Sequence, residues 1–176
     1  MSTRIKEAKL NRCALFRVVL LLVSFVILPG VSAADEKITG RIVSHYIKIE
    51  TMEVGDIPGH VLGVAQKIGL LFFSTGEVAT YKATFYADLN KGNGPFVDYS
   101  LITDQAGDTR FIKATGTADT VSDGKKFVFE GTMECIGGTG KYEGYKGTGS
   151  FKGERVGELK TGGDAYFDFS MNCGKQ

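Results

Sequence analysis

Histidine and cysteine are both scarce in this chain, with two His and three Cys among 176 residues. His45 stands between Val43 and Ile47 in an apolar stretch, and His60 lies in a Pro-Gly turn. Neither histidine has a serine or cysteine partner at the spacing of a catalytic triad, so no hydrolase of that kind is recognised. Cysteines without clustered histidines also make a poor zinc site. We therefore expect no metal and no cofactor.

The chain also lacks an apolar run long enough for a membrane-spanning helix. Residues 18–28 are apolar apart from Ser24, and as a helix they rise only about 16 Å, against a hydrocarbon core of about 30 Å. A basic stretch precedes this run, and Pro29, Gly30 and the small residues 31–33 follow it. This order predicts a cleaved secretory signal over residues 1–33, with an uncleaved anchor as the alternative. We expect a secreted or periplasmic protein.

Excess basic charge is absent once the leader is removed. Residues 1–33 hold five of the 21 Lys and Arg but only one of the 20 Asp and Glu, so the mature chain is slightly acidic. No basic stripe remains, which argues against nucleic acid or an anionic membrane as a partner.

Cysteine pairing becomes simple in the mature chain. Cys13 is removed with the leader, and Cys135 and Cys173 remain. An even pair in an oxidising compartment predicts a disulfide between them. Two buried free thiols are the alternative.

No segment of the mature chain has a convincing helical period, and residues 34–176 form one predicted domain of strands. Apolar and polar residues alternate clearly in several segments, and short turns rich in Gly, Asn and Asp separate them. This turn cadence is typical of a sandwich or an up-and-down barrel. We predict an all-β fold, an eight-stranded antiparallel up-and-down β-barrel, with strands over residues 38–50, 68–74, 78–89, 96–104, 109–118, 125–135, 147–155 and 164–173.

The most distinctive segment is glycine-rich, with seven glycines in the 17 residues 137–153. Tyrosine, phenylalanine and lysine recur between the glycines, so the segment can be ordered. It does not have the spacing of a phosphate-binding loop, because Tyr142 follows Gly140-Lys141 where Ser or Thr is needed. We interpret it as a tight turn that leads into a glycine-rich strand whose backbone approaches its neighbour closely.

This segment resembles the allene oxide cyclase and dirigent barrel superfamily, and most closely its small exported bacterial members. A strand that ends in Phe129-Glu130-Gly131-Thr132 precedes it. The resemblance implies an eight-stranded antiparallel barrel of the allene oxide cyclase type with an apolar central cavity. Since characterised relatives often form trimers, it also implies a homo-oligomer. The residues that carry it are Gly138, Thr139, Gly140, Lys141, Tyr142, Gly144, Gly147 and Gly149.

Aromatic residues supply most of the apolar contact area in pockets of this kind. We therefore expect six phenylalanines around the cavity or core: Phe72, Phe85, Phe111, Phe127, Phe129 and Phe167.

Polar groups inside the barrel would decide whether it can catalyse a reaction. Four residues are candidates: Asp98, Tyr99, Glu130 and Glu134. Alternation favours an inward Phe127-Phe129-Met133 face, which would leave both glutamates in solvent.

The function that follows is binding of a small apolar or amphipathic molecule in the cavity, without catalysis. One alternative is an isomerase or cyclase acting on an unsaturated lipid-like substrate, whose shaped pocket would hold a reactive conformer. Another alternative is a structural or interaction protein without a ligand, which a large apolar patch on the outer wall would favour.

Overall fold

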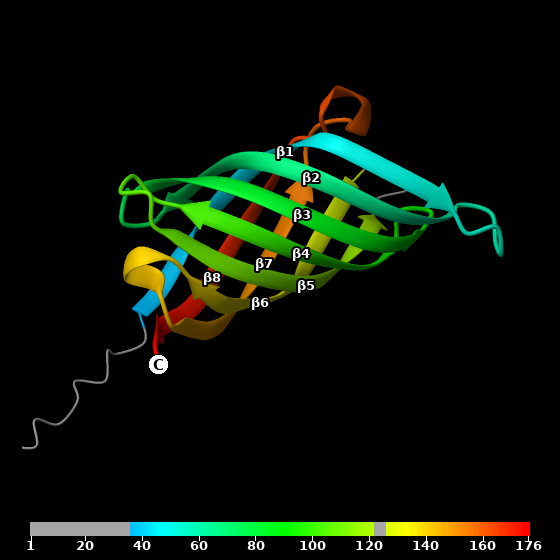
Figure 1. Cartoon of the computed structure of the whole chain (residues 1–176). Coiled ribbons are helices and arrows are strands. Elements are labelled where there is room, and N and C mark those ends of the chain that lie inside the picture. The colour runs from blue at the N-terminus through cyan, green and yellow to red at the C-terminus, as the bar shows by residue number, and fades with distance from the viewer. Residues whose placement is uncertain (1–35, 122–125) are drawn as a thin grey trace, which may run out of the picture. The chain divides into compact units, whose positions relative to one another are not determined.

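A computed structural model describes residues 36–121 and 126–176 (Figure 1). The predicted leader, residues 1–33, lies outside the described residues. Ten elements follow one another along the chain: β1 (Glu36–Glu53), β2 (His60–Phe73), β3 (Val78–Asn90), β4 (Gly94–Thr103), β5 (Thr109–Val121), β6 (Lys126–Gly138), the 3-10 helix η1 (Gly140–Tyr142), β7 (Tyr145–Arg155), the 3-10 helix η2 (Leu159–Thr161) and β8 (Ala165–Lys175).

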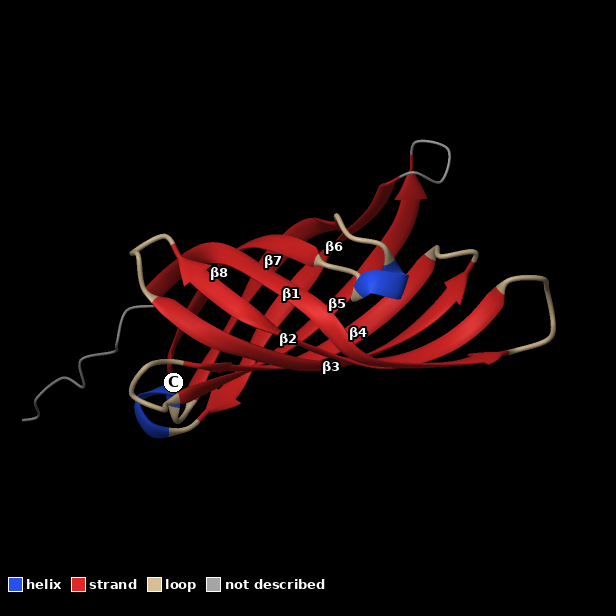
Figure 2. Cartoon of the chain, turned by 90° about the horizontal axis from the view of Figure 1, so that it is seen from above, coloured by secondary structure: helices blue, strands red, loops and turns tan. Residues whose placement is uncertain are grey.

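The eight strands close into a barrel in which each strand pairs with its neighbours in the sequence (Figures 1 and 2). All pairs are antiparallel, and β8 closes the barrel against β1 from Glu36↔Cys173 to Ser44↔Ala165. The prediction of an eight-stranded antiparallel up-and-down barrel is confirmed, and the sandwich alternative is wrong. Among the eight described strands, closure leaves each one paired on both sides.

Strand β2 is longer than its apolar run predicts, because it begins at His60 rather than at residue 68. Its first half alternates with the small Ala65 and the charged Lys67 on the inner face, while Leu62 and Val64 point outward and are 41% and 51% exposed. The charged Lys67 interrupts the alternation of apolar and polar residues, so the sequence did not predict the first half of this strand.

One end of the barrel is closed by packed side chains and a disulfide. Cys135 on β6 and Cys173 on β8 are fully buried and bonded to each other, with their Cα atoms 6.3 Å apart. Both pair in register with Gly147, which lies between them on β7. The predicted disulfide is therefore present, and it joins two strands across a third.

The glycine-rich segment forms a clasp at this same end, where η1 lies beside the β4–β5 turn. Lys141 Nζ lies 2.6 Å from Asp104 Oδ2, and the Tyr142 hydroxyl donates to the same oxygen over 3.0 Å. The Arg110 guanidinium stacks on the Tyr142 ring, 4.0 Å from its centroid. Gly140 has a φ of +56°, in the region that favours glycine. The residues that carry the family resemblance thus have structural roles here.

The strand after the clasp needs glycine for a different reason. A Cβ at Gly149 would collide with the Met171 side chain and the β8 backbone. Close approach of β7 to β8 therefore excludes larger residues, as the sequence indicated.

Candidate functional site

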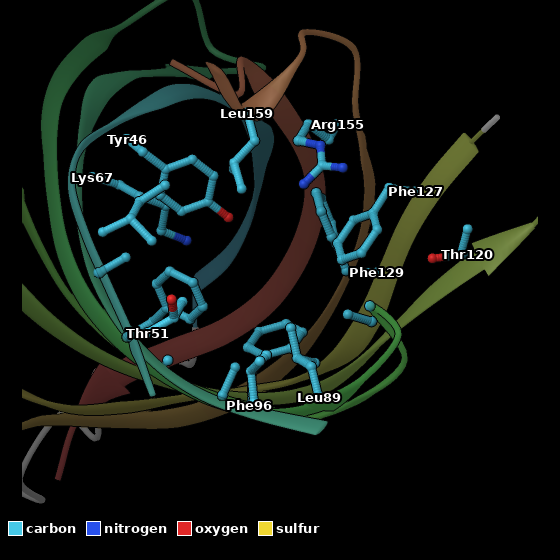
Figure 3. Close-up of a pocket in the computed structure, with 18 of the residues that line it drawn as sticks. Tyr46, Thr51, Lys67, Leu89, Phe96, Thr120, Phe127, Phe129, Arg155 and Leu159 are labelled. Atoms are coloured by element: carbon cyan, nitrogen blue, oxygen red, sulfur yellow. The ribbon is translucent and has the colours of Figure 1, made fainter. Parts of the chain in front are cut away.

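The other end of the barrel contains a cavity of about 600 Å³ (Figure 3). It lies at the end of the barrel where turns connect β1 to β2, β3 to β4, and β7 to β8, away from the disulfide and η1. Leu159 of η2 lies beside its opening. Six aromatic residues line the cavity: Tyr46, Phe85, Phe96, Phe127, Phe129 and Phe167.

A β-bulge in β1 shapes one side of this cavity. The register against β2 shifts between Tyr46 and Lys48, which leaves Ile47 as the additional residue. Before the bulge Tyr46 faces the cavity, and after it Ile49 and Thr51 do. The inserted residue therefore switches which residues of the strand face inward.

The rings pack against one another as well as around the space. Phe129 and Phe167 stack with their centroids 4.8 Å apart, and Phe85 meets Phe96 edge-on at 6.4 Å. Alanines 87 and 118 on β3 and β5 leave room in front of these rings, and they too line the cavity.

The structure divides the six predicted phenylalanines. Phe85, Phe127, Phe129 and Phe167 line the cavity. Phe72 does not, because it is 44% exposed on the outer face while its neighbour Leu71 is fully buried.

Phe111 also lies outside the cavity. It stands between the buried Arg110 and Ile112 on β5, so it faces outward. Phe72 and Phe111 are corrected here for different reasons. Residues 68–74 are apolar on both faces, so residue type did not show which face is inside, whereas on β5 the inner face includes the charged Arg110.

Of the four polar candidates, only Asp98 is inside the barrel, where it is 4% exposed. Tyr99 is 46% exposed on the outer face. Glu130 and Glu134 are exposed as well, on the outer face of β6. The alternating strands turn these three candidates toward solvent, as the alternation on residues 125–135 indicated for both glutamates, so none of the three is a polar group of the interior.

Asp98 belongs to a buried polar cluster that extends to the cavity floor. Its Oδ2 lies 2.6 Å from Lys67 Nζ, and both side chains are 5% exposed. The Tyr81 hydroxyl donates to Oδ2 over 3.3 Å, and the Ser100 hydroxyl donates to Oδ1. The carboxylate is therefore surrounded by three donors, as a buried charge requires.

Lys67 forms the boundary between this cluster and the cavity. Its side chain lines the cavity, whereas Asp98, Tyr81 and Ser100 line a small void of about 20 Å³ beneath it. The ammonium lies 5.0 Å from the ring centroids of both Phe85 and Phe167. Those distances are within the range of cation–π attraction.

The protonation states follow from this environment. Burial is the largest influence on Lys67 and by itself lowers its pKa, but the charge of Asp98, the neighbouring tyrosines and the hydrogen bond to Asp98 together outweigh burial, and the pKa is raised. Burial raises the pKa of Tyr81 and of Tyr46. At neutral pH the cavity floor therefore holds an ammonium group, and both tyrosines keep their hydroxyl protons. In this state Lys67 is a hydrogen-bond donor.

Sequence reasoning missed Lys67, Tyr46 and Phe96. An isolated lysine is ordinarily a solvated residue, and its partner Asp98 is on another strand. The available signal was the two-residue period of a strand, which places Lys67 on the same face of β2 as Ala65 and Leu71. Phe96 shares the inner face of β4 with Asp98 and Ser100, while the outer face carries the more apolar side chains of that strand.

The two histidines lie away from this cavity floor. His45 is exposed, and His60 bridges two carboxylates at 2.6 Å from Asp56 and 2.7 Å from Asp88. Within residues 36–121 and 126–176, no group of three His, Cys, Asp or Glu side chains is placed to hold a metal ion. No helix in this part of the chain is long and apolar enough to cross a membrane.

Comparison with known proteins yields one structural match. A solved structure of the pterocarpan synthase dirigent protein aligns with a TM-score of 0.48 and 12% identity, over 87% of this chain and 96% of that chain. No model of a known family matches the chain, and no curated protein is significantly similar to it. At this identity and TM-score we base no functional argument on the match, and the barrel assignment rests on the strand pairing.

Proposed function

We propose that the mature protein is an exported barrel that binds a small apolar or amphipathic molecule in its cavity without catalysis. The observation that carries the proposal is the cavity of about 600 Å³, walled by six aromatic residues. Ligand sites in proteins are commonly concave, largely apolar and of this size. The resemblance of the glycine-rich segment to exported members of the allene oxide cyclase and dirigent superfamily points the same way.

Export is supported by the covalent bond between Cys135 and Cys173. Disulfides form and persist in oxidising compartments and are rare in the cytosol. Together with the leader expected over residues 1–33, this favours a secreted or periplasmic location.

Catalysis is the weaker alternative because of the state of Asp98. An isomerase or cyclase of a lipid-like substrate needs a polar group that can act on the substrate, and Asp98 is the one predicted candidate inside. Its carboxylate is already bonded to Lys67, Tyr81 and Ser100. A base whose lone pairs are occupied in this way has little capacity to accept a proton.

A role in self-association is a second candidate, favoured by the outer wall of β1 to β4. Large apolar side chains there are between 41% and 53% exposed: Val43, Leu62, Val64, Leu70, Phe72, Tyr86, Tyr99 and Leu101. A broad apolar outer surface is unusual for a monomer, and we propose a homo-oligomer through this wall.

Native mass spectrometry of the protein purified gently from its own host tests both candidates. A bound small molecule on each barrel supports the binding function, and the mass of the intact particle gives the number of subunits. Nile red, a neutral apolar dye, then probes the emptied cavity by fluorescence.

The matched variants for that experiment lie side by side on β5. Ala118→Leu adds volume inside the cavity, whereas Thr117→Leu adds the same side chain on the outer face. We expect the first variant to abolish dye binding and the second to leave it unchanged. An apo mass together with no dye binding by the unmodified protein contradicts the proposed function.

A further inference from the structure

The floor of the cavity offers hydrogen-bond donors at a defined point. A lysine ammonium has three N–H donors and no acceptor. One donor of Lys67 is used by Asp98 at 2.6 Å, and the side chain also lines the cavity. Tyr46 stands beside it with its hydroxyl directed into the space (Figure 3). A ligand that reaches the floor therefore meets donors from two strands.

The charge of the floor is already balanced. Lys67 and Asp98 form a pair of opposite charges, and each is 5% exposed. Among the described residues, Asp98 is the carboxylate within ion-pair distance of Lys67. A second anion placed beside Lys67 would be buried at a large desolvation cost and would share an ammonium already paired with Asp98. The other cationic residues that line the cavity, Lys91 and Arg155, lie on the β3–β4 turn and at the end of β7. An uncharged acceptor avoids that cost.

The faces of the surrounding rings determine the shape that suits the rest of the ligand. Phe85 and Phe167 each lie 5.0 Å from the ammonium, and Phe96 and Phe129 extend the same wall. Flat rings pack well against aromatic walls of this kind. The body of the ligand that fits best is accordingly an aromatic or alicyclic ring system.

We propose that the cavity selects an uncharged carbonyl compound with an apolar ring body, whose carbonyl oxygen accepts hydrogen bonds from Lys67 and Tyr46 at the floor. This inference rests on the proposed function and adds the class of ligand to it. It also gives Lys67 a role beyond pairing with Asp98, as the group that distinguishes an oxygen-bearing ligand from a hydrocarbon.

Three probes with one naphthalene body test the selection by isothermal titration calorimetry. They are 2-acetylnaphthalene with a neutral carbonyl, 2-ethylnaphthalene with no acceptor, and 2-naphthoate with an anionic head. We expect the ketone to bind about tenfold or more tightly than the hydrocarbon, since hydrogen bonds to charged donors are the strong ones. The carboxylate should bind no more tightly than the hydrocarbon.

Two variants connect the preference to Lys67. Lys67→Met removes the donor, but it leaves Asp98 buried without its partner and can fail to fold. The double variant Lys67→Met, Asp98→Asn removes both charges and keeps an amide for Tyr81 and Ser100. In the variant that folds, the preference for the ketone should fall severalfold, to the part that the Tyr46 hydroxyl supplies. Phe85→Leu is the control, and it should weaken all three probes by a similar factor.

The outcomes distinguish the proposed class of ligand from the proposed binding function. Equal affinity of the unmodified protein for all three probes overturns the role of Lys67 while the cavity remains a binding site. Tightest binding of 2-naphthoate overturns the neutral head in favour of an anion. Failure of all three probes to bind overturns the proposed function itself. A ketone preference that is unchanged in the double variant shows that the selecting donor is not Lys67.

Discussion

Breaking the buried pair between Lys67 and Asp98 should strongly destabilise the barrel. The two groups are 2.6 Å apart and 5% exposed, so removal of one leaves the other charged and out of contact with water. That typically costs about 3–5 kcal/mol for a buried pair. Lys67→Met and Asp98→Asn each test the expectation as single variants.

The double variant is the informative comparison. Lys67→Met with Asp98→Asn leaves no buried charge, and a buried pair often contributes little relative to neutral groups of similar size. We therefore expect the double variant to be more stable than the Lys67→Met single variant. A coupling energy of several kcal/mol between the two substitutions would show that the two side chains act as one unit.

Urea unfolding with the disulfide intact measures these differences. With a slope of about 2 kcal/mol/M, the Lys67→Met single variant should shift the midpoint by roughly 2 M. Arg41→Met is the matched control, because Arg41 and Asp168 also lie 2.7 Å apart but are 53% and 42% exposed. Solvent screens that pair, so its loss should be much smaller. Similar effects of the Arg41 and Lys67 variants, or additive effects of the two Lys67 and Asp98 changes, would refute the reasoning.

Two further predictions concern the closed end of the barrel. The double variant Cys135→Ala, Cys173→Ala removes a disulfide whose cysteines are 38 residues apart in the sequence. Its loss should lower the free energy of unfolding by about 4 kcal/mol in the chain-entropy model. Reductant should lower the melting temperature of the unmodified protein and leave that of the variant unchanged. The hydrogen bond from Lys141 lowers the pKa of Asp104 to about 2. The ionised Asp104 carboxylate therefore contributes to stability above the unfolded pKa of about 3.9, and this contribution is lost as pH falls toward 2. Asp104→Asn should therefore destabilise the protein by about 1 kcal/mol at neutral pH, after allowance for screening, and unfolding curves of the two proteins should converge near pH 2; a difference that stays constant would contradict the role of the carboxylate.

Regular alternation made part of the barrel predictable from sequence. On β6, Phe129, Met133 and Cys135 are buried while Glu130 and Glu134 are exposed, because aromatic and charged residues separate cleanly onto the two faces. The same physical signal failed between residues 68 and 74, where both faces are apolar and only the closed barrel shows that Leu71 is inside.

The cavity floor was harder to predict for a different reason. Lys67 violates the rule that charges face water, and only its pairing with Asp98 accounts for the violation. The two residues are on β2 and β4, and β3 lies between them. Alternation describes one strand at a time, so a contact that depends on the barrel closing over both residues leaves no local pattern.

The two ends of the barrel explain why the most distinctive segment of the sequence says little about chemistry. Its glycines, Lys141 and Tyr142 lie at the closed end, where η1 clasps the β4–β5 turn and the disulfide ties β6 to β8. The cavity is at the opposite end and is walled by residues outside that segment. Requirements of packing constrain the first end sharply, since a side chain at Gly149 would collide with β8. Most of the cavity wall consists of side chains rather than of glycines at close backbone approaches, so ligand selectivity can change there while the closed end keeps the barrel intact.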